Sequence, residues 1–223
     1  MRKILFLLLM AKVSLAGSSQ FTTELKVEKK VLKVGYNGSP AVIDWNLDGK
    51  KDIIVGDSAG YIWFYKNIGT DEAPSFDNGE EIEIGDVSFR REDGYAVPHP
   101  CNFDAQRHWD LLIGGADGRI LVAKAINSPT EGITPMFGSV EELRANDKVI
   151  REDYSAPYLF DIDEDNLPDL FLGDKHGQVW FFKNTGRQDL PIFSEGTRTL
   201  LVEDVGQYAK PIITDWNGDG RKD

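Results

Sequence analysis

The sequence is short of cysteine, histidine and basic residues, and these shortages exclude several classes of protein. Among its 223 residues there is one cysteine, Cys101, so no intramolecular disulfide can form, and we expect this cysteine to be a small core residue. Lys+Arg 25 against Asp+Glu 37 give a net charge of -12, which argues against a partner bound through its phosphates, such as nucleic acid. No G-x-S-x-G nucleophile elbow is expected, and the chain lacks an H-E-x-x-H motif and a Gly-rich phosphate loop, which favours a non-enzymatic role.

Long apolar runs are absent as well, and the apolar run at the N-terminus is short. Met1–Lys3 is basic, Ile4–Met10 is apolar, and Ser14–Ala16 ends in small residues. The apolar run is far below the roughly 20 residues that span a bilayer. We therefore predict a signal peptide over 1–16, no membrane span, and a secreted, periplasmic or cell-surface protein. An uncleaved anchor is the alternative.

Glycine and aromatic residues are plentiful. The chain has Gly 22, Trp 5, Tyr 7 and Phe 12, with 41% hydrophobic and 28% charged residues. This composition is that of a folded protein and favours many short strands joined by tight turns. We predict an all-β fold.

An internal repeat divides the rest of the chain. The segment PAVIDWNLDGKKDIIVGDSAGYIWFYKNIG from Pro40 aligns without gaps on PYLFDIDEDNLPDLFLGDKHGQVWFFKNTG from Pro157, and further copies begin at Pro98 and Pro211. This period of between 50 and 60 residues suits a four-stranded propeller blade. The prediction is about three blades of four antiparallel strands and the start of a fourth, as part of a C-terminally truncated ring of about seven blades.

Each copy contains the same strands. Asp52–Gly56 and Asp169–Gly173 are predicted as buried second strands, followed by aromatic third strands at Tyr61–Tyr65 and Gln178–Phe182. The tryptophans of the third strands are expected to pack between blades, with a sugar-stacking platform as the alternative. The predicted parts are an outer strand closing the last blade (17–39), the first blade (40–97), the second, with a degenerate loop (98–156), the third (157–210) and the start of the fourth (211–223).

A polar loop between the first two strands carries the chemistry. Three copies, Asp44–Asp52, Asp161–Asp169 and Asp215–Asp223, have oxygen-bearing side chains at positions 1, 3, 5 and 9 and Gly or Asn at position 6, where the chain must turn. Such a loop suits Ca²⁺, which accepts six to eight oxygens, better than Mg²⁺ or Zn²⁺. At position 7 only the carbonyl oxygen would coordinate the ion. The candidate ligands are Asp44, Asn46, Asp48, Lys50, Asp52, Asp161, Asp163, Asp165, Leu167, Asp169, Asp215, Asn217, Asp219, Arg221 and Asp223.

About three structural calcium ions are therefore expected, because their charge would offset the repulsion between the carboxylates. Solvated Asp-rich turns are the alternative. The second repeat departs from the pattern, since Asn102–Asp110 has only two carboxylates and has Arg107 where the turn should be. We predict no calcium there. The loop is not an EF-hand, because it closes at position 9 and no long helices flank it.

The D-x-[DN]-x-D-[GN]-x-x-D loop, followed by an apolar strand, a G-D-x-x-G turn and an aromatic strand with K-N-x-G, resembles the FG-GAP/VCBS repeat family. The resemblance covers about residues 35–223. It implies a β-propeller of seven or so four-stranded blades like that of integrin alpha subunits, calcium in the loop between the first two strands, and an adhesion, binding or scaffolding role. It also implies that ligands meet the face opposite the calcium loops.

The leading functional hypothesis is a secreted, non-enzymatic, calcium-binding propeller that binds an extracellular protein or glycan. Two alternatives are the propeller part of a polysaccharide-degrading, lyase-like enzyme, or a repeat spacer for another C-terminal domain. Acidic pairs such as Glu80–Glu81 and Glu141–Glu142 are better explained as solvated strand residues than as glycosidase carboxylates. No single ligand-binding residue is predicted.

Overall fold

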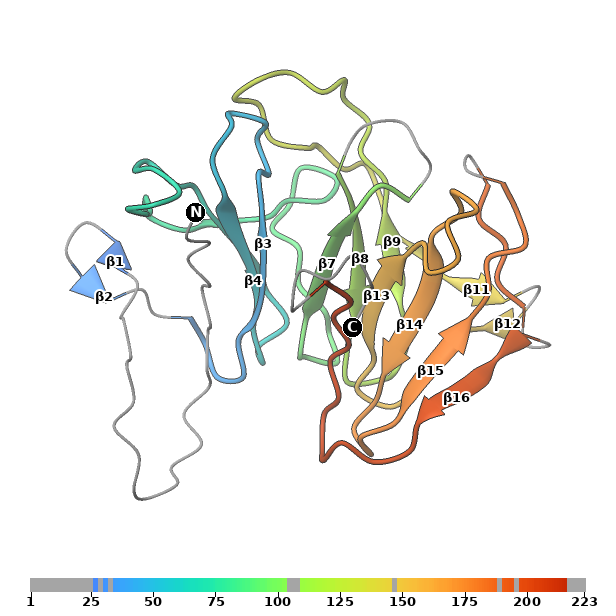
Figure 1. Ribbon diagram of the computed structural model, residues 1–223. Helices are drawn as coiled ribbons and strands as arrows, with labels where there is room; N and C mark the ends of the chain where they lie inside the picture. The colour runs from blue at the N-terminus through green and yellow to red at the C-terminus, as the bar shows by residue number, and fades with distance from the viewer. Residues whose placement is uncertain are drawn as a thin grey trace.

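The computed structural model describes residues 26–27, 30–31, 34–103, 109–145, 148–187, 190–194 and 197–215, and this part of the chain is all-β (Figure 1). Twelve of its strands form three four-stranded antiparallel sheets in the order of the chain, which confirms the predicted fold class. The first sheet is β3 (Ser39–Ile43), β4 (Asp52–Gly56), β5 (Ile62–Tyr65) and β6 (Glu80–Glu81). The second is β7 (Val97–Cys101), β8 (Asp110–Gly114), β9 (Leu121–Ala123) and β10 (Glu141–Glu142). The third is β13 (Ala156–Phe160), β14 (Asp169–Gly173), β15 (Val179–Phe182) and β16 (Thr199–Val202).

Two short hairpins accompany the sheets, β1 (Lys26–Val27) with β2 (Lys30–Val31) and β11 (Arg144–Ala145) with β12 (Lys148–Val149). The first hairpin falls within 17–39, and the outer-strand role predicted for that segment stays a prediction. Residues 1–16 lie outside the described residues. Within the described ranges, no helix is long and apolar enough to cross a membrane.

The sheets stand side by side like blades, with β3, β7 and β13 as neighbouring first strands (Figure 1). The structure shows no closed ring. In all three sheets the second strand is fully buried and the outer strand is short or exposed. The acidic pairs Glu80–Glu81 and Glu141–Glu142 are the outer strands β6 and β10, as expected for solvated strand residues.

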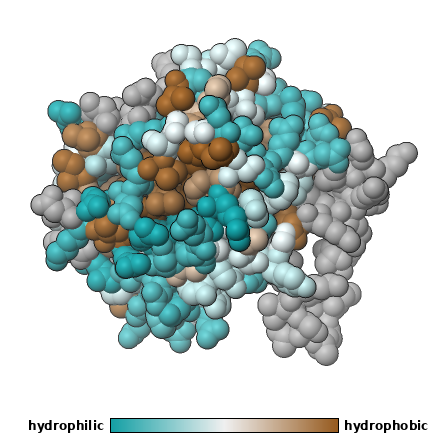
Figure 2. Space-filling model, turned by 180° about the vertical axis from the view of Figure 1, so that it is seen from behind, coloured by the Kyte–Doolittle hydropathy of each residue, from teal (hydrophilic) through white to brown (hydrophobic). Residues whose placement is uncertain are grey.

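Hydrophobic clusters fill the two spaces between sheets. Ile54 and Leu111 belong to the cluster between the first and second sheets, while Leu170 and Phe182 belong to the one between the second and third. Cys101 is buried in the second cluster, which confirms its predicted core position. On the surface, hydrophobic side chains lie among mostly hydrophilic ones on the face seen from behind (Figure 2).

Both third-strand tryptophans are half-buried, but only Trp180 packs between two described sheets as predicted, while Trp63 packs against residues of its own repeat. Trp180 is packed against the cluster between the second and third sheets, and the Arg198 guanidinium lies 3.7 Å from the centre of its ring. Trp63 packs against the residues of the first sheet that surround Phe76. Each indole N–H also donates to an aspartate of the preceding turn, Trp63 to Asp57 at 3.2 Å and Trp180 to Asp174 at 3.3 Å.

Candidate metal centre

The acidic loop between β13 and β14 folds by bonding its own backbone. The Asp161 carboxylate accepts the N–H groups of Asp165 at 3.1 Å and Asn166 at 2.8 Å, and Asp165 accepts that of Leu167 at 2.9 Å. Asp and Asn favour such local turns because their short side chains reach backbone donors a few residues on. The turn brings one carboxylate oxygen from each of Asp161, Asp163 and Asp165 within 4.8 Å of one another.

The loop between β3 and β4 repeats this geometry. Asp44 accepts the N–H groups of Asp48 at 3.0 Å and Gly49 at 2.9 Å, and Asp48 accepts that of Lys50 at 3.1 Å. Position 6 has a left-handed backbone in both loops, with φ of 84° at Gly49 and 65° at Asn166, which confirms the predicted turn. The two loops therefore share one fold, although Asn46 supplies an amide where the third sheet has a carboxylate.

Position 4 is also left-handed, and the sequence did not indicate this. Leu47 has φ of 59° and Glu164 has φ of 61°. Neither residue type favours a positive φ. The hydrogen bonds on either side of the position, and not its own preference, set this turn.

The aspartate at position 9 anchors the loop to the sheet. Asp52, Asp110 and Asp169 are buried and begin the second strands. One oxygen of each accepts a backbone N–H that follows the third strand, from Asn67 at 2.8 Å, Ala125 at 2.9 Å and Asn184 at 2.8 Å. The other oxygen of Asp52 and Asp110 accepts the N–H at position 2, from Trp45 at 3.1 Å and Phe103 at 3.0 Å.

Asp169 differs from the other two in one atom. Its Oδ2 is buried and has no hydrogen-bond partner among the described residues. Burial raises the pKa of this carboxyl group by desolvation, which outweighs the hydrogen bond from Asn184. A buried carboxylate oxygen without a partner, next to three converging carboxylates, fits a hard cation with oxygen ligands.

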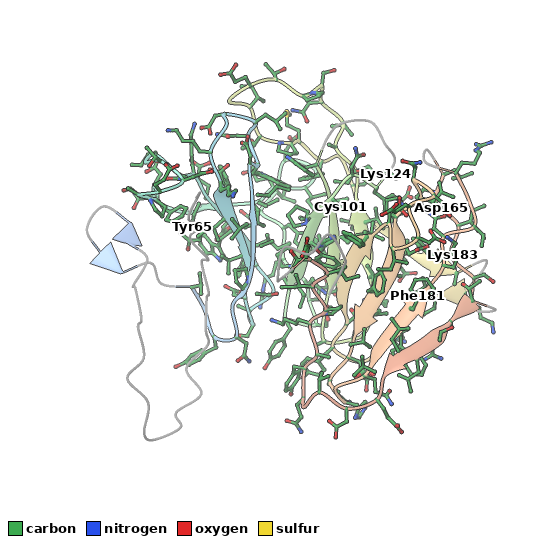
Figure 3. The ribbon with its side chains drawn as sticks, in the orientation of Figure 1. Tyr65, Cys101, Lys124, Asp165, Phe181 and Lys183 are labelled. Carbon is green, nitrogen blue, oxygen red and sulfur yellow. The ribbon has the colours of Figure 1, made fainter. Side chains whose placement is uncertain are left out.

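A lysine supplies positive charge to the same cluster. The Lys183 ammonium group pairs with Asp163 and, at 2.6 Å, with Asp165, and it lies 3.9 Å from Asp169. Asp165 and Lys183 lie at the same end of the third sheet (Figure 3). The hydrogen bonds that the Lys183 ammonium group donates to Asp163 and Asp165 raise the pKa of Lys183. In the first loop, Lys66 is placed similarly, 3.3 Å from Asp48.

These lysines follow the third strands, and neither was predicted as part of the site. The K-N pair that recurs in the repeats could have indicated these lysines, because Lys66 and Lys183 occupy the same repeat position. Of the third predicted loop, only Asp215 lies within the described residues. Asn217, Asp219, Arg221, Asp223 and Arg107 of the second repeat lie outside them.

The expectation that the chain has no nucleophile-elbow pattern is wrong, because Gly56–Gly60 in the first repeat reads G-x-S-x-G. This pattern marks a nucleophile elbow only where a strand turns into a helix. Here it joins β4 to β5, and the Asp57 carboxylate accepts the N–H groups of Ala59 at 2.9 Å and Tyr61 at 3.1 Å. The pattern therefore builds a turn between strands, and Ser58 has no hydrogen bond to a described histidine.

Repeated four-stranded antiparallel sheets, each with a loop between its first two strands, are the build of a propeller-type module. Comparison with known families agrees with this class: residues 161–223 match the FG-GAP-like repeat family. The matched segment begins at Asp161, the first residue of the acidic loop. The chain therefore contains an FG-GAP-like repeat, which confirms the resemblance for this segment. A search of curated proteins found no match to the chain.

Proposed function

We propose that this protein is a secreted, calcium-binding, non-enzymatic module of the propeller type, which binds an extracellular protein or glycan. The observation that carries the proposal is the cluster of Asp161, Asp163 and Asp165 beside the unpartnered oxygen of Asp169, in the segment that matches the FG-GAP-like repeat. The signal-peptide pattern over 1–16 supports export.

The chain's own residues explain what a bound ion would do. Asp161, Asp163, Asp165 and Asp169 would hold it, and the ion would supply a double positive charge to offset their mutual repulsion. The backbone bonds of Asp161 already orient the loop, so little ordering is left for binding. The role is structural, and the first loop would act in the same way with Asn46 in place of one carboxylate.

Calcium is expected to stabilise the folded chain by about 1–3 kcal/mol per site at concentrations from several-fold to a hundredfold above the dissociation constant. Thermal unfolding with added calcium, compared with unfolding in chelator, measures this effect. Asp165→Asn should reduce the calcium-dependent rise in Tm, because it removes one charge from the cluster. Asp86→Asn, at an exposed position outside the loops, is the control and should leave the rise unchanged. A folded sample whose Tm is the same with calcium and with chelator would contradict the proposal.

Removal of the competing lysine is expected to tighten calcium binding. In Lys183→Met the ion no longer displaces an ammonium group from Asp163 and Asp165, so the dissociation constant should fall by roughly tenfold. The calcium-free variant should also melt at a lower temperature. Isothermal titration measures the affinity. Lys175→Met, which removes the salt bridge to Asp153, is the control and should bind calcium as the parent does. Unchanged or weaker binding by Lys183→Met would show that this lysine does not compete.

A further inference from the structure

Three tyrosines occupy one repeat position with an unusual backbone. Tyr95, Tyr154 and Tyr208 each lie three residues before the proline that opens the next repeat. Their φ angles are 56°, 56° and 61°. A positive φ is uncommon for a bulky residue, and strained backbone of this kind is found at ligand clamps and other functional sites. The first repeat has Asn37 at the same position, with φ of 53°.

Backbone hydrogen bonds to the sheet that precedes each tyrosine hold the tyrosines in this conformation. The N–H of Tyr95 donates to Ser58 at 3.4 Å, that of Tyr154 to Ala116 at 3.3 Å and that of Tyr208 to Lys175 at 3.3 Å. Each acceptor lies in the turn between the second and third strands of the preceding sheet. The same backbone hydrogen bond to that turn therefore holds each of the three tyrosines at a positive φ.

The side chains form a continuous row. The ring centres of Tyr95 and Tyr154 are 5.0 Å apart and those of Tyr154 and Tyr208 are 5.2 Å apart, both edge to face. The Asn37 amide donates to the Tyr95 hydroxyl at 3.4 Å and extends the row to the first repeat. Asn37, Tyr95 and Tyr154 precede the first strands β3, β7 and β13, whereas the acidic loops follow β3 and β13. The row therefore lies at the opposite end of the sheets from the candidate metal centre (Figure 1).

A hollow of about 260 Å³ lies along this row. The three tyrosines, Asn37 and Lys210 line it, and the rest of the lining is glycine, alanine and one valine. Lys210 is the only charged residue in the lining, and the described residues give it no ion pair. In a chain of net charge -12, a hollow whose lining has one basic residue and no carboxylate favours a ligand with a single negative charge.

We propose that this hollow binds the uronic acid residue of an acidic glycan. Its volume is below the roughly 300–1,000 Å³ of pockets for drug-sized molecules, so it suits a single ring. Phenol rings offer apolar surface to the C–H face of a sugar, while their hydroxyls and the Asn37 amide can bond sugar hydroxyls. Lys210 supplies the cation for the carboxylate. The proposal deepens the ligand-binding role proposed above and rests on it.

The matched test uses the residue that the first repeat already has at this position. Tyr154→Asn removes the middle ring and its two ring contacts but installs a residue that tolerates a positive φ better, so the variant should still fold. Lys210→Gln removes the cation. Tyr36→Asn, at a tyrosine that is 85% exposed and outside the row, is the control.

The probes are D-glucuronate, D-glucose and benzoate. Each is titrated into the purified chain, and its binding is measured from chemical-shift changes. We expect a dissociation constant on the order of 1 mM for D-glucuronate, as befits a single small ring. Tyr154→Asn should weaken it by roughly tenfold, and Lys210→Gln should remove the preference over D-glucose. Tyr36→Asn should bind as the parent does.

The other outcomes would overturn the proposal in distinguishable ways. Equal binding of D-glucose by the parent would overturn the acidic ligand, and binding of benzoate without D-glucuronate would overturn the sugar. Glucuronate binding that survives Tyr154→Asn and Lys210→Gln would overturn the location but leave glycan recognition intact. Absence of glucuronate binding in a sample that calcium still stabilises would overturn the hollow as a uronate site and leave the calcium module standing.

Discussion

Replacing Arg91 by methionine is expected to lower the free energy of unfolding by about 3–5 kcal/mol, because the change breaks a buried ion pair from one side only. The Arg91 side chain is 1% exposed. Its guanidinium donates to Asp93 at 3.0 Å, to Asp117 at 2.6 Å and to the Ile113 carbonyl at 3.0 Å. Methionine fills a similar volume but removes the guanidinium donor from each of these acceptors.

Arg91 joins two repeats, which is why its loss should be felt by the whole chain. It follows the outer strand of the first sheet, while Asp117 and Ile113 belong to the second repeat. Asp117 is also bonded by Arg119, and these bonds together with the two arginine charges lower its pKa despite the opposing effect of desolvation. The substitution therefore disconnects the sheets at a point where both carboxylates are partly buried.

Urea unfolding of the variant and the parent measures the loss. Arg90→Met is the control, because Arg90 is exposed, bonds the Ala59 carbonyl at 3.0 Å and lies 5.4 Å from the centre of the Tyr61 ring. Its loss should cost less than about 1 kcal/mol. Equal losses of unfolding free energy in Arg91→Met and Arg90→Met would show that the buried Arg91 network stabilises the fold no more than an exposed arginine does.

The sequence contained a signal for this network, and only a comparison between repeats reveals it. In the first and third repeats, Asp57 and Asp174 bond the indoles of Trp63 and Trp180. The second repeat has Gly115 in place of the aspartate and leucine in place of the tryptophan. A Cβ at Gly115 would lie 2.0 Å from Arg91 Nε, so the glycine makes room for the guanidinium. The joint replacement of aspartate and tryptophan indicated that the second repeat makes a different contact at this turn. It did not indicate that Arg91 would supply that contact.

The sheets themselves were predictable because their signals are local and repeated. Buried second strands such as Asp52–Gly56 are continuous apolar runs after a polar loop, and the repeat period places them in register. The turns of the acidic loops were predictable for the same reason, since Asp and Asn bond backbone donors within a few residues. Each of these features depends on residues close together in the sequence.

Features of the site that join distant residues were not predictable in this way. Lys183 reaches the loop from the far end of the third strand, about 20 residues away. The row of tyrosines exists because junction bonds from the preceding sheet hold each one at a positive φ. The repeated K-N pair marks the position of Lys183 but not its contact with the loop, and residue type gives no hint of the tyrosine row, because tyrosine normally avoids that backbone region.

The glycine that ends each second strand gives the second large effect. A Cβ at Gly56, Gly114 or Gly173 would lie 2.0–2.1 Å from a backbone carbonyl oxygen two residues before the proline that opens the next repeat. At Gly114 that oxygen belongs to Ser155, whose N–H donates to the Gly115 carbonyl at 3.0 Å. Because the clash is with hydrogen-bonded backbone, which cannot rotate away, Gly114→Ala is expected to cost about 3 kcal/mol or more.

Thermal and urea unfolding test this, with Gly138→Ala as the control because the nearest atom to its added Cβ is 3.7 Å away. A small loss for Gly114→Ala, similar to that of Gly138→Ala, would mean that the junction can open without cost. The Gly114→Ala substitution should also affect the proposed ligand site, because Ser155 directly follows Tyr154. Pushing Ser155 away should displace the middle tyrosine of the row, so Gly114→Ala should weaken D-glucuronate binding at temperatures where the variant is still folded, and Gly138→Ala should not.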